Sequence, residues 1–384
     1  MKQAILYEKQ DENIIKCLLC SHYCEIKPGQ AGTCLLRKNV DGELYTYSYG
    51  ASTGFAIDPI EKKPFYHFKP GSKVLSFGTP GCNFKCLNCQ NWQLSHVKRN
   101  TIEQLTAEYP PSLIAELAIK NNVDGIAYTY SEPTIFFEYA RDTILECRKN
   151  YPDIELFHIF ISNGFMSKET IQLIKNEKLI SAINIDLKFI NSEKYKKICH
   201  ASLQPVLDNI KRFQDLSDFI HMEIINLVIP GENDTEEDFE KLSQFIFSVN
   251  PEIPVHFSRF HPANKLQDKP ATDLKTLFRA KQIAEETGLK YIYIGNTNLP
   301  DVENTYCPNC KTLLINRNMY SIKVQKWLGI DVCRPKDQRI EIQIDERIKA
   351  QIKDSTKKLT THNSQLITKN GICLKCEQTI NIRL

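Results

Sequence analysis

The chain has 384 residues, of which 42% are hydrophobic and 25% charged, with 49 basic and 46 acidic side chains. This apolar content is near the average for a globular protein and excludes disorder as the main state. The formal net charge of +3 gives no electrostatic case for binding nucleic acid or an anionic membrane. The length is that of two or three domains, or of one barrel with appendages.

The 14 cysteines are the unusual feature of the composition. The first residues contain no apolar run of signal-peptide length, and no stretch of 18 or more apolar residues predicts a membrane span. A chain of this length can also bury a core without disulfides. We therefore expect the cysteines to be reduced, cytoplasmic and largely bound to metal.

The segment 1–72 is rich in cysteine, tyrosine and glycine and contains the first thiol cluster. The cluster has spacings of two, three and nine residues and consists of Cys17, Cys20, Cys24 and Cys34. Four thiolates saturate a tetrahedral ion, which favours structural zinc, but the same set can hold an auxiliary iron–sulfur cluster. Both alternatives stay open.

The second cluster follows the first strong strand signal and contains three thiols, Cys82, Cys86 and Cys89. Three thiolates leave one coordination position of a metal open, and a substrate or cofactor can bind there. This smallest cluster is therefore the predicted catalytic centre. A zinc knuckle that lacks its fourth ligand is the alternative interpretation.

Short apolar segments rich in β-branched and aromatic residues alternate with helical patterns between residues 73 and 294. Buried parallel strands have this composition, and repeated strand–helix units predict an α/β fold with a parallel sheet, open or closed into a barrel. The predicted strands are Lys73–Phe77, Gly125–Thr129, Leu156–Ile161, Ala182–Leu187, His221–Ile229, Pro254–Phe260 and Lys290–Ile294.

Helical periodicity is clearest in five segments between these strands. Two of them begin with residues that can cap a helix, Ser167 and Thr235, and another ends before Gly288, which suits a C-terminal cap. The predicted helices are Thr134–Lys149, Ser167–Lys178, Leu203–Leu216, Thr235–Val249 and Asp273–Thr287.

Polar residues follow the ends of several predicted strands. In a barrel of parallel strands, functional groups collect on the loops that follow the strands. Termination of a strand by any polar residue is the alternative explanation at each position. The residues concerned are Ser131, Glu132, Asn163, Asp186, Lys188, Pro230, Gly231, Arg259 and His261.

The segment 299–384 contains two CxxC knuckles, and its thiols are Cys307, Cys310, Cys373 and Cys376. The knuckles look like the two halves of a zinc-ribbon site, separated by a charged insertion at about 325–370. Zinc ribbons can bind nucleic acid, but the segment has no basic stripe with interleaved aromatic residues, so a structural cap is expected.

The loop around the second cluster, from Gly81 to Trp92, resembles the cluster loop of the radical S-adenosylmethionine (SAM) superfamily. More widely, the segments 57–68, 128–133, 162–165, 184–188, 228–234 and 256–262 resemble AmmeMemoRadiSam system radical SAM enzymes. These are relatives of the activating enzymes for pyruvate formate-lyase. The resemblance covers about residues 14–315 and the last knuckle, and the long gap between the two knuckles departs from it.

The resemblance implies a partial (β/α)6 TIM-type barrel over residues 73–298, with small Cys-rich metal-binding segments at both ends. It also implies a [4Fe–4S] cluster held by Cys82, Cys86 and Cys89, with SAM on the fourth iron. An electron then cleaves SAM reductively to a 5′-deoxyadenosyl radical. The implied activity is that of a radical SAM enzyme, of oxidoreductase or activating-enzyme type, acting on an unidentified substrate.

The resemblance assigns SAM contacts to residues on three loops. Ser131 and Glu132 stand in the methionine-binding loop, where a carboxylate can accept hydrogen bonds from the amino group of SAM. Asn163 stands where the superfamily contacts the ribose or the carboxylate of SAM. Pro230 and Gly231 give the backbone a close approach to the adenine.

Four further residues are implied to act near the reacting centre. Asp186 and Lys188 lie two residues apart on one side of a strand and would face SAM and the substrate. A structural Asp–Lys ion pair is the alternative for them. Arg259 and His261 would face the substrate, although a turn residue before a proline is an equal interpretation of His261.

The family name further implies MEMO-like and AMMECR-type partner proteins, and the chemistry requires a low-potential electron donor. A second hypothesis is an activase that places a glycyl radical on a partner enzyme. A third, of a different class, is a non-catalytic zinc-binding scaffold or nucleic-acid module that uses all clustered thiols for zinc.

Overall fold

The computed structural model describes residues 1–98, 105–318, 321–324, 371–373, 376 and 378–383. The predicted insertion at 325–370 lies outside these residues. The chain divides into two compact units, each built from two stretches, Met1–Phe65 with Ser72–Thr297 and Tyr66–Gly71 with Asn298–Leu384. Residues 1–65 thus belong to the same unit as the large central sheet. The division into the segments 1–72, 73–298 and 299–384 stays a prediction.

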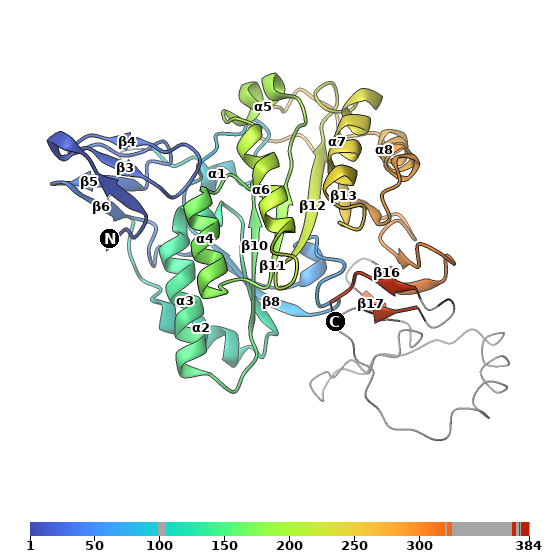
Figure 1. Ribbon diagram of the computed structural model, residues 1–384, viewed down its shortest axis with the longest axis horizontal. Coiled ribbons are helices and arrows are strands. Elements are labelled where there is room, and N and C mark those ends of the chain that lie inside the picture. Colours follow the sequence, from blue (N-terminus) through green and yellow to red (C-terminus); the bar gives the residue numbers. More distant parts are fainter. Residues whose placement is uncertain (99–104, 319–320, 325–370, 374–375, 377, 384) are drawn as a thin grey trace. The chain divides into compact units, whose positions relative to one another are not determined.

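An eight-stranded sheet forms the centre of the first unit, in the order β14-β13-β12-β11-β10-β9-β8-β7 (Figure 1). The strands from β8 to β14 pair in parallel, and β7 joins β8 antiparallel. The strands are β7 Thr53–Pro59, β8 Lys73–Gly78, β9 Gly125–Tyr128, β10 Phe157–Ser162, β11 Ala182–Asp186, β12 His221–Val228, β13 Val255–Arg259 and β14 Ile292–Gly295. All seven predicted strands are confirmed, and β7 was not predicted.

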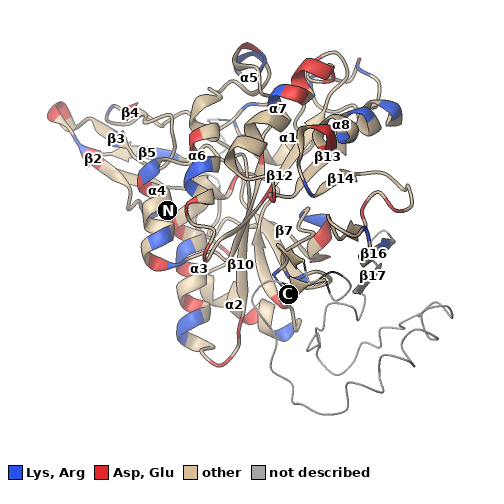
Figure 2. Cartoon of the chain, turned by 45° about the vertical axis from the view of Figure 1, so that its right-hand side comes forward, with Lys and Arg blue, Asp and Glu red and all other residues tan. Residues whose placement is uncertain are grey.

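Helices connect successive parallel strands, which gives six strand–helix units followed by β14 and confirms the α/β fold with a partial (β/α)6 array. In Figure 2 the charged residues colour mainly the helices, whereas most of the sheet is tan. None of the helices in the described part of the chain has the length and apolar character needed to cross a membrane. The helices are α1 Trp92–Ser95, α2 Pro111–Lys120, α3 Phe137–Asn150, α4 Lys168–Glu177, α5 Ser192–Cys199, α6 Gln204–Gln214, α7 Glu236–Val249 and α8 Leu274–Thr287.

The helix ends carry the predicted caps. Ser167 Oγ accepts a hydrogen bond from Thr170 N at 3.1 Å at the start of α4, and Thr235 Oγ1 accepts one from Asp238 N at 3.2 Å at the start of α7. Gly288 ends α8 with φ +103°, a conformation that a side chain disfavours. These caps fix where the loops on either side of the helices begin.

Two small antiparallel sheets precede the large one. They are β1 Lys2–Gln3, β6 Glu43–Thr46 and β5 Arg37–Val40 in one sheet, and β2 Tyr7–Lys9, β3 Ile15–Cys17 and β4 Glu25–Ile26 in the other. Arg37 at the start of β5 forms a buried ion pair with Glu138 of α3, with Nη1 at 2.8 Å and 3.0 Å from the two carboxylate oxygens. This pair fixes the N-terminal strands to the first unit's helical layer.

The second unit contains two small antiparallel sheets and the short segment Tyr66–Gly71. His67 Nδ1 lies 2.6 Å from Asn381 O, and Phe68 forms a parallel bridge with Arg383, so the segment is held by the last described residues of the chain. The strands are β15 Thr305–Tyr306, β16 Leu313–Asn318, β17 Ser321–Val324, β18 Gly371–Ile372 and β19 Thr379–Ile380.

Candidate functional site: a three-cysteine loop after the first parallel strand

The three predicted catalytic cysteines lie on one loop between β8 and α1. The loop contains Gly81, which has φ +98°. A Cβ at this position would lie only 2.2 Å from Leu36 Cδ1. Phe84 N donates a hydrogen bond to Cys82 Sγ at 3.3 Å, which turns the chain around that thiol. Cys86 is buried, whereas Cys82 and Cys89 are partly exposed. The loop therefore offers three thiols from a single turn of chain.

Burial raises the pKa of Cys82 well above the usual range for a thiol and also raises that of Cys89. For Cys86 a hydrogen bond with the Cys199 thiol is the largest cause of a raised pKa, followed by burial. The thiols are thus protonated at neutral pH when no metal is bound. Metal ligation by these cysteines must release protons, because the ligands are thiolates.

Buried polar atoms without a hydrogen-bond partner gather on and beside this loop. They belong to the loop itself, to the loop after β9 and to the last residue of β11. Buried polar groups are nearly always bonded in native proteins, so a polar group that binds here would complete the site. The atoms are Thr79 Oγ1, Asn83 Nδ2, Lys85 Nζ, Asn88 Oδ1, Ser131 Oγ and Asp186 Oδ1.

Glu132, the predicted SAM contact after β9, is buried and strongly bonded to the protein. Its Oε1 accepts from Thr134 N at 3.0 Å and from Ser162 Oγ at 2.8 Å, and its Oε2 accepts from Asn163 N at 2.8 Å. Burial raises the pKa of Glu132, and these donors oppose the increase. The carboxylate thus connects the loops after β9 and β10, and Oε2 keeps acceptor capacity for one more donor.

Asn163, predicted to contact SAM, is placed directly against the cysteine loop. Its Nδ2 donates to Asn83 Oδ1 at 2.7 Å and lies 3.9 Å from Cys82 Sγ, and its Oδ1 accepts from Phe165 N at 3.0 Å. The structure therefore brings together the first thiol, the loop after β9 and the loop after β10. The proximity follows from the parallel order of β8, β9 and β10, whose carboxyl ends lie at one edge of the sheet.

Asp186 and Lys188, at the end of β11, form an ion pair between Asp186 Oδ2 and Lys188 Nζ. Burial alone would lower the pKa of Lys188, but the Asp186 carboxylate raises it, and so do Cys86 and Cys199 when they are thiolates. Lys188 is therefore a fixed positive charge on the Cys86 side of the loop. Its partner Asp186 still has one buried oxygen without a hydrogen bond.

Pro230 and Gly231 follow β12, and Gly231 has φ +75° with open space at its Cα apart from Lys269 Nζ at 3.5 Å. Lys269 Nζ donates to Pro230 O at 3.0 Å and fixes this turn. Asn233 Nδ2 donates to Lys188 O at 2.9 Å, which places the turn next to the end of β11. The backbone at Pro230 and Gly231 is thus accessible to a flat ligand at the same edge of the sheet.

Arg259 and His261 lie at the end of β13 and after it, respectively. Arg259 Nε donates to Thr272 O at 2.9 Å, and His261 is exposed. Further along the same loop, Asn264 Nδ2 donates to Cys86 O at 3.1 Å and Lys265 N donates to Leu87 O at 2.9 Å. The loop after β13 therefore contacts the cysteine loop through residues that the sequence analysis did not single out.

Cys199, the last residue of α5, is a second residue that was missed. It is fully buried, its thiol is the neighbour that raises the pKa of Cys86 most, and its carbonyl accepts from Lys85 N at 3.3 Å. Ile198 O accepts from Leu87 N at 2.9 Å, so the end of α5 holds the backbone on both sides of Cys86. A solitary cysteine far along the chain gives no sequence signal for such a contact.

The four N-terminal cysteines line a common cavity in the same unit. Cys17, Cys20 and Cys34 are buried and Cys24 is partly exposed. Burial raises the pKa of the Cys20 thiol well above its usual range and that of Cys34 to about 11. The structure thus brings these predicted ligands together around one space.

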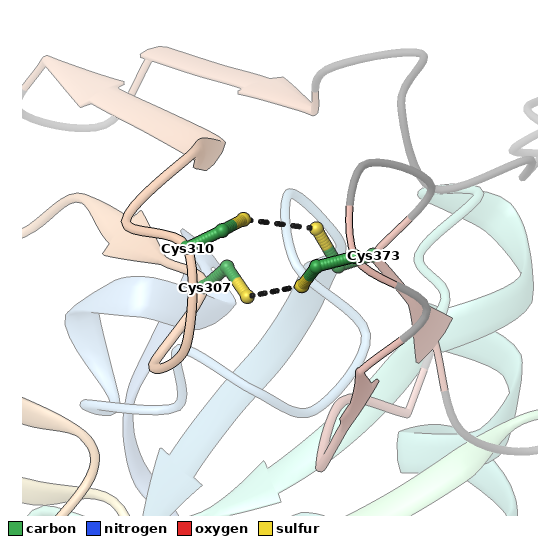
Figure 3. Close-up of side chains that lie close together, drawn as sticks. Cys307, Cys310 and Cys373 are labelled. Carbon is green, nitrogen blue, oxygen red and sulfur yellow. Dashed lines mark hydrogen bonds between the residues drawn. The ribbon is translucent and has the colours of Figure 1, made fainter.

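The four C-terminal cysteines form the most compact group of potential ligands in the described part of the chain (Figure 3). Their sulfur atoms all lie within 4.8 Å of one another, with Cys307 Sγ 3.6 Å from Cys376 Sγ and Cys310 Sγ 3.6 Å from Cys373 Sγ. Sulfurs around a tetrahedral zinc ion are separated by about 3.8 Å, because Zn–S bonds are about 2.3 Å long. The donor set and its spacing therefore fit one tetrahedral ion.

The family model of the radical SAM superfamily matches residues 77–246, which contain the cysteine loop and the strands from β9 to β12. The chain is also 42% identical over 347 residues to the uncharacterized protein MJ0808 of Methanocaldococcus jannaschii, covering 89% of this chain and 99% of that protein. The chain belongs to the radical SAM superfamily. Membership implies an enzyme, with a [4Fe–4S] cluster and SAM as its cofactors.

More distant radical SAM relatives include pyruvate formate-lyase-activating enzyme of Staphylococcus aureus, 21% identical over 192 residues, which are 47% of this chain and 71% of that enzyme. A solved domain of pyruvate-formate lyase-activating enzyme from Bacteroides vulgatus is 22% identical with a TM-score of 0.38, covering 45% of this chain and 99% of that domain. Streptococcus suis SuiB bound to S-adenosylmethionine is 15% identical with a TM-score of 0.45, covering 58% of this chain and 52% of SuiB.

Proposed function

We propose that the chain is a radical SAM enzyme that cleaves SAM reductively to a 5′-deoxyadenosyl radical. The observation that carries this proposal is the three-thiol loop after β8, which lies among buried polar atoms without a hydrogen-bond partner in the part of the chain that the structure describes. Cys82, Cys86 and Cys89 would hold a [4Fe–4S] cluster. When bound, the cluster and SAM supply a one-electron cleavage of the sulfonium C–S bond.

The chain's own residues would bind and orient SAM around this loop. Lys188 would neutralise the methionine carboxylate, and Asp186 Oδ1 and Ser131 Oγ would bond polar groups of the ligand. Glu132 Oε2, which accepts one hydrogen bond from the protein, would accept a second from the SAM amino group. Asn163 beside Cys82 would bond the ribose or the carboxylate of SAM.

Other predicted site residues would complete the pocket at the carboxyl edge of the sheet. The open backbone at Pro230 and Gly231 would contact the adenine. Arg259 and the exposed His261, after β13, would face the substrate, which must approach from solvent. The substrate itself is unidentified.

Structural zinc is proposed for the C-terminal cysteines, on the basis of their sulfur spacing. The described cysteines contain no disulfide, which fits a reducing, cytoplasmic location. The quoted sequence segments support assignment to the AmmeMemoRadiSam system, with MEMO-like and AMMECR-type partners and a low-potential electron donor.

An activase for a glycyl-radical enzyme is the second candidate function. The similarity to pyruvate formate-lyase-activating enzyme of Staphylococcus aureus, which spans 47% of this chain, favours it. This activity requires a partner enzyme whose backbone acquires an EPR-active, oxygen-labile radical after treatment with the activated chain.

The deciding experiment is a SAM cleavage assay under anaerobic conditions. The chain is reconstituted with iron and sulfide, reduced with dithionite and incubated with SAM, and 5′-deoxyadenosine is quantified. Cleavage that depends on the cluster supports the proposal, whereas an intact cluster without cleavage contradicts it. Zinc alone, without iron, after anaerobic purification would instead support a zinc-binding scaffold or nucleic-acid module.

A further inference from the structure

The N-terminal cysteines enclose a cavity that the proposed function does not use. Cys17 ends β3, Cys20 and Cys24 lie in the turn between β3 and β4, and Cys34 precedes β5. All four thiols line the cavity, whose other walls include the apolar side chains of Leu19, Ile26 and Ile135. Four thiols that converge on one apolar-walled space are a ligand set for metal rather than a packing arrangement.

The spacing of these thiols differs from that of the C-terminal set. The C-terminal sulfur atoms all lie within 4.8 Å of one another. No other group of three or more potential ligands in the described residues meets this limit, so the N-terminal thiols are spaced more widely. A single tetrahedral ion needs sulfurs about 3.8 Å apart. Ligands on separate irons of an iron–sulfur core lie farther apart, so the wider N-terminal set suits a cluster.

A buried cation lies at the same cavity. Arg37, which lines it, is 1% exposed and forms its ion pair with Glu138 at 2.8 Å. A cluster with four thiolates is an anion, and Arg37 would offset part of that charge. Zinc with four thiolates is an anion as well, so Arg37 favours a metal site in this cavity, and the sulfur spacing favours a cluster.

The N-terminal cysteine loops contact the catalytic loop directly. His22, between Cys20 and Cys24, donates from Nε2 to Asn83 O at 2.8 Å, and Asn83 is the neighbour of Cys82. On the other side, Leu36, two residues after Cys34, packs so tightly against Gly81 that a Cβ there would lie 2.2 Å from it. Residues close to the N-terminal cysteines thus contact residues adjacent to Cys82 of the catalytic loop.

We propose that Cys17, Cys20, Cys24 and Cys34 hold a second iron–sulfur cluster that relays electrons to the catalytic cluster. The inference rests on the proposed function. One electron passes from a low-potential iron–sulfur or flavin protein to the N-terminal cluster, which is reoxidised as the catalytic cluster is reduced. That same electron then enters the sulfonium C–S bond of SAM, which breaks into methionine and the 5′-deoxyadenosyl radical.

Metal and sulfide analysis of the anaerobically purified full chain tests the ligand set. We expect about eight irons and eight sulfides per chain, plus one zinc, and a loss of about four irons in Cys20→Ala/Cys24→Ala. The matched control is Cys147→Ala, a buried cysteine of α3 outside every cluster, which should keep the full iron content. About four irons with two zincs in the unaltered chain would overturn the second cluster.

A spectroscopic measurement on the unaltered chain covers the case in which the double variant fails to fold. EPR of the reduced protein should contain two iron–sulfur signals, of which SAM perturbs one and leaves the other unchanged. A single signal that SAM converts completely, in protein with about four irons, would contradict the proposal.

The relay is tested by comparing two reductants in the same preparation. Two rates of SAM cleavage are measured, one with a reduced ferredoxin-type donor and one with dithionite. We expect Cys20→Ala/Cys24→Ala to lower the ratio of the first rate to the second at least tenfold. An unchanged ratio overturns the relay. Absence of cleavage with both reductants in the unaltered chain contradicts the proposed function, while the iron count still decides whether a second cluster exists.

Discussion

The catalytic loop and the C-terminal cysteine pairs use short cysteine spacings in opposite ways. The C-terminal pairs bring four sulfurs within 4.8 Å, a closed set that saturates one ion and leaves no position for a ligand. The catalytic loop brings three thiols to the edge of a sheet, where neighbouring polar atoms have no hydrogen-bond partner among the described residues. Sequence spacing therefore identifies a metal site, whereas the number of thiols and the state of the surrounding polar groups indicate whether it can react.

The largest effect is expected for Cys86→Ala in the open site. Loss of this thiolate should remove the catalytic cluster and reduce SAM cleavage to the rate without enzyme, because two remaining thiols do not hold the cluster at low potential. Iron content, the SAM-sensitive EPR signal and 5′-deoxyadenosine formation measure this. Cys147→Ala is the control. Equal losses of iron and of SAM cleavage in both variants would contradict the assignment of Cys86, and not Cys147, as a cluster ligand.

Removal of metal from the closed site should unfold the C-terminal unit while the sheet survives. Structural zinc contributes about 10–16 kcal/mol of apparent folding free energy in small zinc domains, so Cys310→Ser should expose the segment around β16 to protease. Hydrogen exchange followed by mass spectrometry measures protection in both units. Preserved protection of β16 together with loss of zinc would show that the unit does not depend on its metal.

The next largest effect concerns the attachment of the N-terminal cysteine strands to α3. Arg37→Met leaves Glu138 buried without its partner and should lower the free energy of unfolding by about 3–5 kcal/mol. The matched control is Arg141→Met, whose pair with Glu177 is 27% and 26% exposed and should contribute about 1 kcal/mol or less. Urea denaturation under anaerobic conditions compares them, and equal losses would contradict the assigned role of burial.

The smallest effect is expected for Cys199, whose buried thiol is the neighbour that raises the pKa of Cys86 most. Cys199→Ala should make the midpoint potential of the catalytic cluster more negative and slow SAM cleavage about tenfold, because hydrogen bonds to ligand sulfurs raise cluster potentials. Cys199→Ser keeps a hydrogen-bond donor and should restore most of the midpoint potential and most of the cleavage rate. An EPR-monitored redox titration measures the potential, and an unchanged potential in Cys199→Ala would leave Cys199 with a packing role alone.

The sequence alone allowed the main sheet to be predicted because its buried parallel strands are continuous apolar segments. The positions of Asn163, Asp186 and Lys188 near the catalytic loop followed from the same topology, since parallel strands end at one edge. Strand β7 was missed because its burial pattern is irregular, with much of it partly exposed. The contacts of Cys199 and Asn264 were missed because they depend on tertiary packing between distant segments.

Glu132 shows a limit of another kind. Its position in the loop after β9 was predicted, but its bonds to Thr134, Ser162 and Asn163 were not. A carboxylate with several acceptor sites can serve the fold and a ligand together, and sequence spacing does not distinguish these uses. Variants of Glu132 are therefore poor tests of SAM binding, since they also release two loops.

The pairing of Tyr66–Gly71 with the end of the chain has a consequence for synthesis on the ribosome. Phe68 bridges Arg383, and His67 bonds Asn381 O, so these residues meet their partners only after synthesis has passed residue 383. The nascent chain must carry this segment unpaired while the sheet that follows it emerges and folds. Completion of the C-terminal unit is thereby a late event, and a ribosome-stalled chain ending before residue 371 would lack it.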